Sequence, residues 1–205
     1  MTTLVVLAKA PEAGRVKTRL CPPLTLAGAA DVAAAALADT LDAVLASTVD
    51  RRVLALCGAM ASIPPGFEVR PQRGDGLGQR LTAAFADCGP GPVLLIGMDT
   101  PQVTAGLLDN ALRQLAASEA VLGRTHDGGW WALGLRDVGH AVVLADVPMS
   151  TCDTGALTYA ALLRRGIAAE PLPVRQDVDT LADARAVAEL APASRFARAL
   201  AEASA

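Results

Sequence analysis

Short apolar runs alternate with segments of helical periodicity along most of the chain. The apolar runs that we predict to be strands are 4–8, 52–57, 67–70, 92–97, 120–123, 130–135 and 167–172. The segments that we predict to be helices are 25–48, 77–88, 104–117, 154–165, 180–190 and 193–203. This alternation indicates an α/β fold, with a mostly parallel sheet and helices on both of its faces.

The length and composition fit one domain with an aliphatic core. The chain has 205 residues, of which 52% are hydrophobic, 19% charged and only 3% aromatic. That length is sufficient for one sizeable core and short for two. Because there is no internal repeat and no long linker, we expect residues 1–205 to form a single domain.

Charge and hydropathy exclude several classes of protein. The formal net charge is −3, whereas proteins that bind nucleic acids usually carry a basic face, so we expect no nucleic-acid partner. No stretch approaches ~18 uninterrupted apolar residues, so we expect no membrane span. The four cysteines are far apart in the sequence, which argues against a zinc site or disulfide framework and suits a reducing cytoplasm.

Sheets of this kind bind ligands beyond the carboxyl ends of their strands, so the loop after the first strand is informative. Residues 7–20 contain the only two lysines of the chain, Lys9 and Lys17, together with Arg15 and Arg19. Ammonium and guanidinium groups both suit phosphate oxygens, which makes this loop a candidate diphosphate site. The alternative is a solvated basic loop. The loop matches neither the Walker pattern nor G-x-G-x-x-G, which disfavours a P-loop NTPase or a dinucleotide dehydrogenase.

A second candidate segment is PQRGDGLGQRL, residues 71–81. Its closely spaced glycines permit a ligand to approach the backbone. Gln72 can both donate and accept hydrogen bonds, which suits recognition of a nucleobase edge. The alternative is a flexible turn that Asp75 caps before the following helix.

Three aspartates follow predicted strands. Asp99 comes after the clearest apolar run, and Asp177 and Asp179 alternate just before a helix. Alternate residues of an extended segment share a face, and two carboxylates there repel unless a cation or a proton separates them. Together with Asp99, they could form an oxygen-rich site for Mg²⁺ or Mn²⁺. The alternative is that these acids, or Thr100, only cap helices.

The segment HDGGWW, residues 126–131, offers a polar turn with an aromatic wall. Asp127 projects at the turn, and Gly128 and Gly129 expose the backbone. The two tryptophans are consecutive, so on a strand they point to opposite faces and at most one lines a cleft. This segment could bind a sugar or an acceptor, and the alternative is a hairpin turn of the Asp-Gly type. Neither histidine of the chain has a nucleophile partner, so we assign no hydrolytic triad.

Six segments, in order, carry a resemblance to a known family: KAPEAGRVKTRL, GDGLGQR, IGMDTPQ, DGGWWALGL, MSTCDTG and DVDT. They resemble the small bacterial glycosyltransferase-A-like proteins, including glycosyltransferases of the arsenosugar-biosynthesis type, within the nucleotide-diphospho-sugar transferases. More distantly, the chain is similar to sugar-phosphate and to phosphoenolpyruvate or phospholactate nucleotidyltransferases. The resemblance implies a Rossmann-like, glycosyltransferase-A-type fold with a mostly parallel, mixed sheet.

The resemblance also implies which residues form the site. The implied nucleotide contacts are Ala8, Lys9, Gly14, Lys17, Arg19, Gln72 and Gly78. The implied sugar or acceptor contacts are Asp127, Gly128, Gly129, Ser150 and Thr151. The implied metal ligands are Asp99, Asp177 and Asp179, and the implied catalytic groups are Lys17, Arg19 and Asp127.

These expectations describe a cytoplasmic, Mg²⁺- or Mn²⁺-dependent transferase that uses a nucleotide-activated donor. We favour glycosyl transfer from a nucleoside-diphosphate sugar to a small acceptor, because the closer resemblance is to that branch. A nucleotidyltransferase that releases pyrophosphate would use the same phosphate loop. A third alternative is a non-catalytic nucleotide-binding module, against which the three acidic residues Asp99, Asp177 and Asp179 argue. Whether the protein forms a homodimer is left open.

Overall fold

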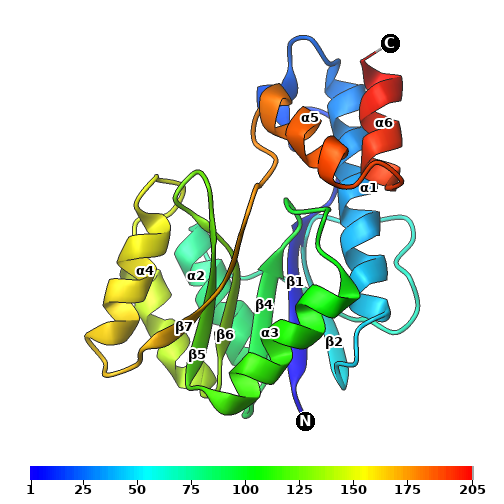
Figure 1. Cartoon of the computed structure of the whole chain (residues 1–205). Helices are drawn as coiled ribbons and strands as arrows, with labels where there is room; N and C mark the ends of the chain where they lie inside the picture. Colours follow the sequence, from blue (N-terminus) through cyan, green and yellow to red (C-terminus); the bar gives the residue numbers. More distant parts are fainter. Residues whose placement is uncertain (205) are drawn as a thin grey trace.

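A computed structural model describes residues 1–204 of the protein, which are built around a seven-stranded sheet (Figure 1). The strands are β1 (Thr3–Lys9), β2 (Arg51–Cys57), β3 (Glu68–Pro71), β4 (Val93–Gly97), β5 (Ala120–Thr125), β6 (Trp130–Leu135) and β7 (Ala169–Arg175). Their order across the sheet is β3-β2-β1-β4-β6-β5-β7. Every neighbouring pair is parallel except the two that include β6. The predicted α/β fold with a mostly parallel, mixed sheet is confirmed.

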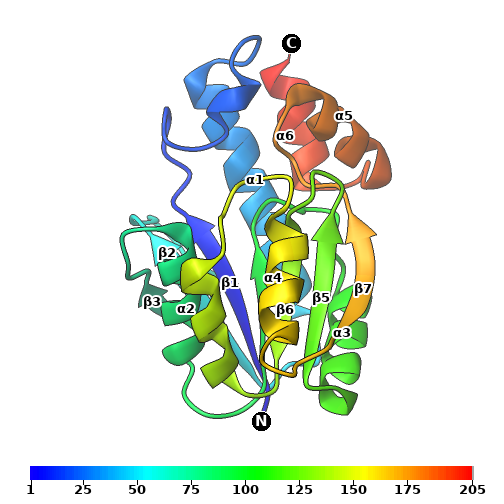
Figure 2. The same ribbon diagram turned by 90° about the vertical axis from the view of Figure 1, so that its left-hand side faces the viewer.

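Helices cover both faces of the sheet (Figures 1 and 2). The helices are α1 (Leu26–Leu45), α2 (Leu77–Ala86), α3 (Ala105–Ala117), α4 (Thr154–Leu163), α5 (Leu181–Leu190) and α6 (Arg195–Ala203), with the 3-10 segments η1 (Thr18–Leu20) and η2 (Val138–Asp146). On one face, Leu37 of α1 and Leu108 of α3 pack in the same core as β1 and β4. On the other face, Phe85 of α2, Leu144 of η2 and Leu162 of α4 form a second layer.

A smaller core lies beyond the carboxyl ends of the strands, where α5 and α6 stand beside the first half of α1 (Figure 1). Its buried members include Val32 on α1, Val187 on α5, Phe196 on α6, and Val178 in the segment that leads to α5. The C-terminal helices therefore form a wall above the edge of the sheet at which α/β folds bind ligands.

The longest helix, α1, connects the two cores. Ala33, Leu37 and Leu41 belong to the core against the sheet. Asp39 caps the start of α6, because its carboxylate accepts a hydrogen bond from the N–H of Phe196 at 2.8 Å. Although α1 is rich in alanine, no helix in the described part of the chain is long and apolar enough to cross a bilayer.

The elements that the sequence predicts are present, with shifted ends. The strand predicted over 167–172 runs over Ala169–Arg175 instead. Pro171 and Pro173 interrupt its apolar pattern, and they are tolerated because β7 lies at the edge of the sheet. The segments η1 and η2 were not predicted, since short 3-10 turns have no periodic signal to detect.

Gly78 has a packing role in this fold. It is buried in the first turn of α2, where a Cβ atom would lie 2.2 Å from the carbonyl oxygen of Leu144 in η2. Glycine allows the two segments to approach this closely. The predicted contact of Gly78 with a nucleobase stays a prediction.

The substitution Gly78→Ala should destabilise the fold by about 1–3 kcal/mol, because the added methyl group forces α2 and η2 apart. Urea unfolding followed by circular dichroism measures the change. Gly106→Ala is a matched control, since Gly106 is the second residue of α3 as Gly78 is of α2, and a Cβ there meets nothing within 4 Å. The control should be neutral or slightly stabilising, and equal losses in the two variants would contradict the packing role.

Candidate active site

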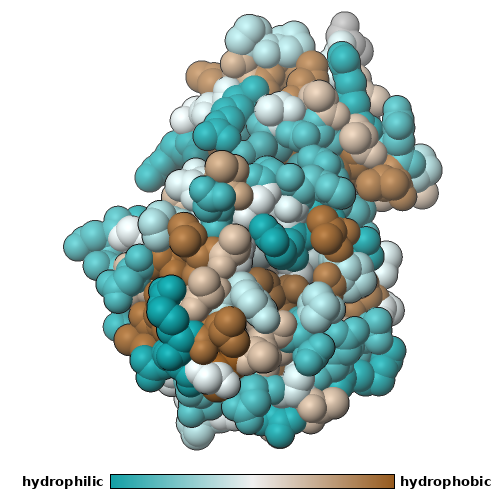
Figure 3. Space-filling view, turned by 60° about the vertical axis from the view of Figure 1, so that its left-hand side comes forward, coloured by the Kyte–Doolittle hydropathy of each residue, from teal (hydrophilic) through white to brown (hydrophobic). Residues whose placement is uncertain are grey.

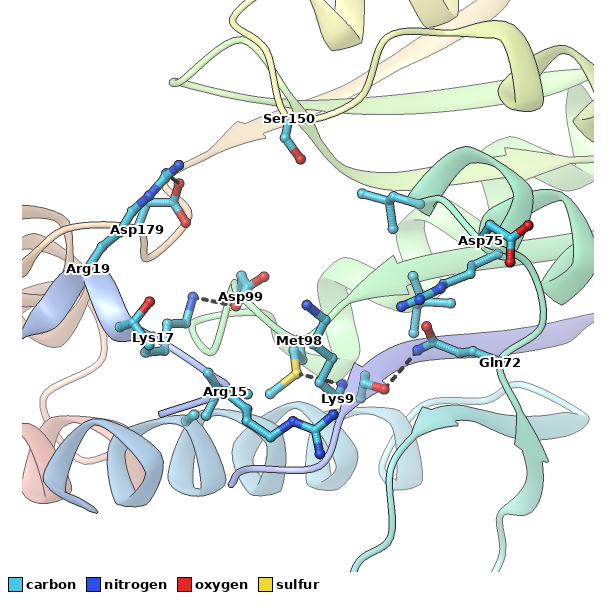
Figure 4. A pocket seen from close by; sticks show the side chains of 17 residues that line it. Lys9, Arg15, Lys17, Arg19, Gln72, Asp75, Met98, Asp99, Ser150 and Asp179 are labelled. Carbon is cyan, nitrogen blue, oxygen red and sulfur yellow. Dashed lines mark hydrogen bonds and ion pairs between the residues drawn. The ribbon is translucent and has the colours of Figure 1, made fainter. Parts of the chain in front are cut away.

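A cavity of about 520 Å³ lies at the carboxyl ends of β1 and β4 (Figure 4). Its charged lining residues are Lys9, Arg15, Lys17, Arg19, Asp75, Arg80, Asp99 and Asp179. In the space-filling view, hydrophilic side chains predominate between the sheet and the part of the molecule that contains α5 and α6 (Figure 3). The cavity therefore combines both signs of charge in a volume that suits a small-molecule substrate.

Lys17 makes an ion pair in this cavity. Its side chain is largely buried, and its ammonium group pairs with the Asp99 carboxylate and donates a hydrogen bond to the Val178 carbonyl. The backbone of Lys17 is left-handed, with φ of 48°, a conformation that is uncommon for non-glycine residues and is concentrated at functional sites. Lys17 thus joins the loop after β1, the end of β4 and the segment before α5.

Val178 fixes the acidic C-terminal segment against the end of β4. Its side chain is fully buried in the smaller core, and its N–H donates to the Asp99 carbonyl at 2.9 Å. The flanking residues, Asp177 and Asp179, are tied to this anchored position through the backbone. Their carboxylates are consequently held close together.

Three carboxylates meet beside this segment. One oxygen atom from each of Asp127, Asp177 and Asp179 lies within 4.8 Å of the other two, so a single hard cation could contact all three. The sequence analysis grouped Asp99 with Asp177 and Asp179. The structure replaces Asp99 by Asp127 in this group, because Asp99 pairs with Lys17 and the β5–β6 hairpin carries Asp127 to the other two acids.

The pKa of Asp177 reflects the crowding of negative charge. Partial burial, followed by repulsion from Asp127, Asp179 and Asp99, raises this pKa from 3.8 to about 6, although a backbone hydrogen bond opposes the shift. A positive charge among the carboxylates would offset the repulsion and favour the ionised form of Asp177. The arrangement therefore favours the binding of a cation, or of a proton when no cation is present.

Helix capping does not explain the acids that we predicted as metal ligands. Helix α3 is capped by Thr104, and α5 begins with a capping box made by Thr180 and Asp183. Asp75 is also no cap, because Gly76 occupies the N-cap of α2 without a side-chain bond. Helix capping is therefore excluded as the role of Asp75, Asp99, Asp177 and Asp179, and these carboxylates are available to bind a ligand.

The cations of the first loop lie on one side of the cavity. Arg19 donates to Asp179 through Nη1 at 2.7 Å, and Arg15 bonds Glu12 at 2.9 Å. The Lys9 side chain has no ion pair in the described residues. Figure 4 shows Lys9, Arg15 and Lys17 facing a common space. The loop thus offers several positive groups to one ligand.

Gln72 lines the cavity with its amide group fixed. Its two amide hydrogens donate to the carbonyls of Ala8 at 2.8 Å and Ala55 at 2.9 Å (Figure 4). A flipped amide would bring its oxygen against two carbonyl oxygens, so the orientation is determined. Gln72 can therefore offer a ligand only its oxygen, and not the donor and acceptor together that the sequence suggested.

The turn between β5 and β6 confirms the hairpin alternative, and it also carries Asp127 to the acidic group. A Cβ atom on Gly128 would lie 1.8 Å from the carbonyl oxygen of Cys152. The turn therefore packs closely on the loop that contains Thr151, whose backbone N–H donates to Thr154. Gly128, Gly129 and Thr151 lie outside the cavity lining and support its rim instead.

The two tryptophans pack in the cores. Trp131 is buried on the α1–α3 side and donates to the Pro173 carbonyl at 3.0 Å. Trp130 is half-buried and packs against the core on the opposite face. The predicted alternation of faces is confirmed, but neither ring lines the cavity. The expected aromatic wall is therefore absent from the lining residues in the described part of the chain.

The remaining predicted residues are divided between the cavity and its surroundings. Ala8 lines the cavity, and so does Ser150, whose backbone is left-handed with φ of 60°. Ser150 faces the cations of the first loop from the opposite side (Figure 4). Gly14 does not line the cavity. The lining residues Leu77 and Met98 were missed, although Met98 directly precedes Asp99 and could have been inferred from that position.

The solved structures that the chain resembles include transferases that use nucleotides. The crystal structure of a candidate nucleotide-diphospho-sugar transferase from Desulfovibrio desulfuricans G20 is 26% identical, with a TM-score of 0.86 over 98% of this chain and 94% of that one. Rv0371c from Mycobacterium tuberculosis H37Rv, in complex with manganese, is 26% identical, with a TM-score of 0.57 over 92% of this chain and 97% of that one. A 2-C-methyl-D-erythritol 4-phosphate cytidylyltransferase from Thermus thermophilus, at 15% identity and a TM-score of 0.58 over the whole of both chains, shares the fold alone.

The chain thus has the fold of the candidate nucleotide-diphospho-sugar transferase, as the sequence resemblance implied. The chain belongs to the family described as "Uncharacterized protein conserved in bacteria (DUF2064)", whose model matches residues 29–151. No curated protein sequence matches the chain.

The raised pKa of Asp177 predicts a pH-dependent stability in metal-free buffer. Because the folded pKa of about 6 exceeds the unfolded value of 3.8, the folded state binds more protons between these values and loses stability as the pH rises through them. Asp177→Asn should remove this loss and stabilise the protein at pH 8 by about 1–2 kcal/mol, after allowance for solvent screening.

Urea unfolding with a chelator present, at pH 4 and pH 8, measures the effect. Asp31→Asn removes an exposed carboxylate of α1 and should leave the wild-type pH dependence unchanged. If Asp177→Asn is no more stable than the wild type at pH 8, the carboxylates do not repel one another as described.

Proposed function

We propose that the protein is a divalent-metal-dependent glycosyltransferase that transfers a sugar from a nucleoside diphosphate to the hydroxyl group of a small acceptor. The observation that carries this proposal is the meeting of the basic loop of residues 15–19 with three clustered carboxylates at the carboxyl edge of one sheet. Neighbouring sites of opposite charge suit a substrate with a diphosphate on one side and a cation on the other.

The donor's phosphates are proposed to bind the cations of the first loop. Lys9 and Arg15 line the cavity, and the ammonium group of Lys17 has a third hydrogen beyond its bonds to Asp99 and Val178. Arg19 has further donors beyond the one that bonds Asp179. Charge-assisted bonds from these groups would hold the diphosphate and stabilise the charge that grows on it as the sugar leaves.

The acidic group is proposed to hold Mg²⁺ or Mn²⁺. Asp127, Asp177 and Asp179 supply the hard oxygen ligands that these ions prefer. Burial, and then repulsion by the neighbouring carboxylates, raises the pKa of Asp177, and a bound cation would offset the repulsion. A bound divalent ion would supply Lewis-acid neutralisation of the diphosphate's charge. Rv0371c was crystallised with manganese, which supports a metal in this fold. Asp127 is accordingly proposed as a ligand and not as an acceptor contact.

The opposite side of the cavity is proposed to bind the acceptor. Ser150 lines this side. The cations that line the cavity come from residues 9–19 and from Arg80, not from the loop of Ser150. An anionic acceptor would therefore meet few positive groups, which favours a neutral hydroxyl over the acceptor phosphate that nucleotidyl transfer requires.

If this proposal is correct, a nucleoside-diphosphate sugar should stabilise the protein against heat only when Mn²⁺ is present. At about 100 times the dissociation constant, binding contributes roughly 2.7 kcal/mol, or a rise in Tm of about 5–10 °C. Differential scanning fluorimetry with UDP-, GDP- and CDP-sugars measures the shift. Asp179→Asn should abolish the metal-dependent part, and Asp31→Asn should retain it. A shift that is identical with chelator in place of Mn²⁺ would contradict the metal assignment.

The identity of the released product distinguishes glycosyl transfer from nucleotidyl transfer. With its preferred donor and an acceptor mixture, the protein should release a nucleoside diphosphate, detected by coupled phosphatase assay or chromatography, and no pyrophosphate. Wild-type protein without Mn²⁺ is the control and should release neither. Release of pyrophosphate from a nucleoside triphosphate would instead assign the protein to the nucleotidyltransferases, and tight binding with no turnover would indicate a non-catalytic module.

A further inference from the structure

The side chain of Thr125 occupies an unusual position at the end of β5. Thr125 is a buried polar residue, only 6% exposed, and it follows a break in the regular pairing of its strand. The register of β5 shifts between Gly123 and Arg124 against β6, and between Gly123 and Thr125 against β7. Such bulges turn a side chain away from the direction that regular alternation would give it, and they are frequent beside active sites.

The Thr125 hydroxyl is directed at the carboxylate of Asp127. Its Oγ1 donates a hydrogen bond to Asp127 Oδ1 at 2.5 Å, and the N–H of Gly129 donates to the same oxygen at 2.8 Å. No hydrogen bond to Asp127 Oδ2 occurs among the described residues. One carboxylate oxygen is thus held by two donors, while the other is left for a further partner.

The turn that carries Asp127 is itself held in place from both sides. The backbone N–H of Gly128 donates to the Thr125 carbonyl at 3.1 Å, and the N–H of Gly155 donates to the Gly128 carbonyl at 2.8 Å. A Cβ atom on Gly129 would lie 3.0 Å from Thr125 Oγ1 and 3.2 Å from Asp127 Oδ1. The backbone of the turn is therefore fixed without the Thr125 hydroxyl, which leaves that hydroxyl the task of orienting the carboxylate.

We propose that Thr125 is a positioning residue that orients Asp127 as the third carboxylate of the metal site, an inference that rests on the proposed function. Asp127 is the exposed member of the group, whereas Asp177 and Asp179 are half-buried, so it has the most rotational freedom to lose. Groups that orient a metal ligand typically affect metal affinity by about 10- to 100-fold. Loss of the hydroxyl should therefore weaken the metal site and leave the fold intact.

The test is the affinity of the nucleotide-free protein for Mn²⁺, measured by electron paramagnetic resonance of the free and bound ion. Thr125→Val keeps the shape of the side chain and removes the hydroxyl, and we expect it to weaken Mn²⁺ binding by about 10-fold. Thr125→Ser restores the hydroxyl and should bind Mn²⁺ within about 2-fold of the wild type. Asp127→Asn should weaken binding at least as much as Thr125→Val.

Thr40→Val is the matched control, because Thr40 is also a buried threonine with a hydrogen-bonded hydroxyl. That hydroxyl donates to the backbone carbonyl of Ala36 at 2.9 Å and not to a carboxylate. The control should leave Mn²⁺ affinity unchanged. Wild-type affinity in Thr125→Val, or equal losses in Thr125→Val and Thr40→Val, would overturn the positioning role alone. If the wild type itself fails to bind Mn²⁺, with or without nucleotide, the proposed function and this inference both fail.

Discussion

The ammonium group of Lys17, held between the Asp99 carboxylate and the Val178 carbonyl, is the contact on which the candidate site depends. It joins three segments that are remote in the sequence: the loop after β1, the end of β4 and the strand-to-helix segment before α5. A largely buried ammonium group is unfavourable unless it is paired and hydrogen-bonded, and this one has both kinds of partner. Removing the Asp99 carboxylate would leave an uncompensated charge where the three segments meet.

Apolar packing of Val178 holds the segment before α5 against the partners of Lys17. Val178 lies fully buried in the smaller core. Its own N–H bonds to the Asp99 carbonyl, and the carbonyl of Gln176, two residues earlier, accepts a hydrogen bond from the side chain of Gln102. The free energy that keeps the carboxylates of Asp177 and Asp179 close comes from this burial and these bonds, since the carboxylates themselves repel. Burial of Asp177, and then this repulsion, raises the pKa of its carboxyl group.

In the β5–β6 hairpin, too, packing and backbone bonds hold the segment in place while a carboxylate is left to bind a ligand. Glycines allow the turn to pack against the loop of Cys152 at distances that no side chain would permit. Backbone bonds fix the turn, and two donors then fix one oxygen of Asp127. A rigid support with a free carboxylate oxygen is the arrangement that an oxygen-ligand metal site requires, and here both of its parts belong to one tight hairpin.

Much of the fold could be predicted from the sequence, because the periodicity of apolar residues follows directly from which faces of each element are buried. The order of strands and helices, the mixed sheet and the position of Asp99 after β4 were all available in this way, as was the resemblance that the family match and the solved structures confirm. That residues 1–205 form one domain, and that particular side chains bind substrate, stay predictions.

Only the tertiary structure decided which residues meet. Sequence order placed Asp99 with Asp177 and Asp179, whereas the fold pairs Asp99 with Lys17 and brings Asp127 to the other two acids. It also assigned Gly78 to helix packing and fixed the amide of Gln72. The physical reason is that the local sequence pattern indicates only which residues of each element are buried. Contacts between loops depend on how the strands pair and on where a bulge turns a side chain. Neither strand pairing nor the position of a bulge has a local sequence signal.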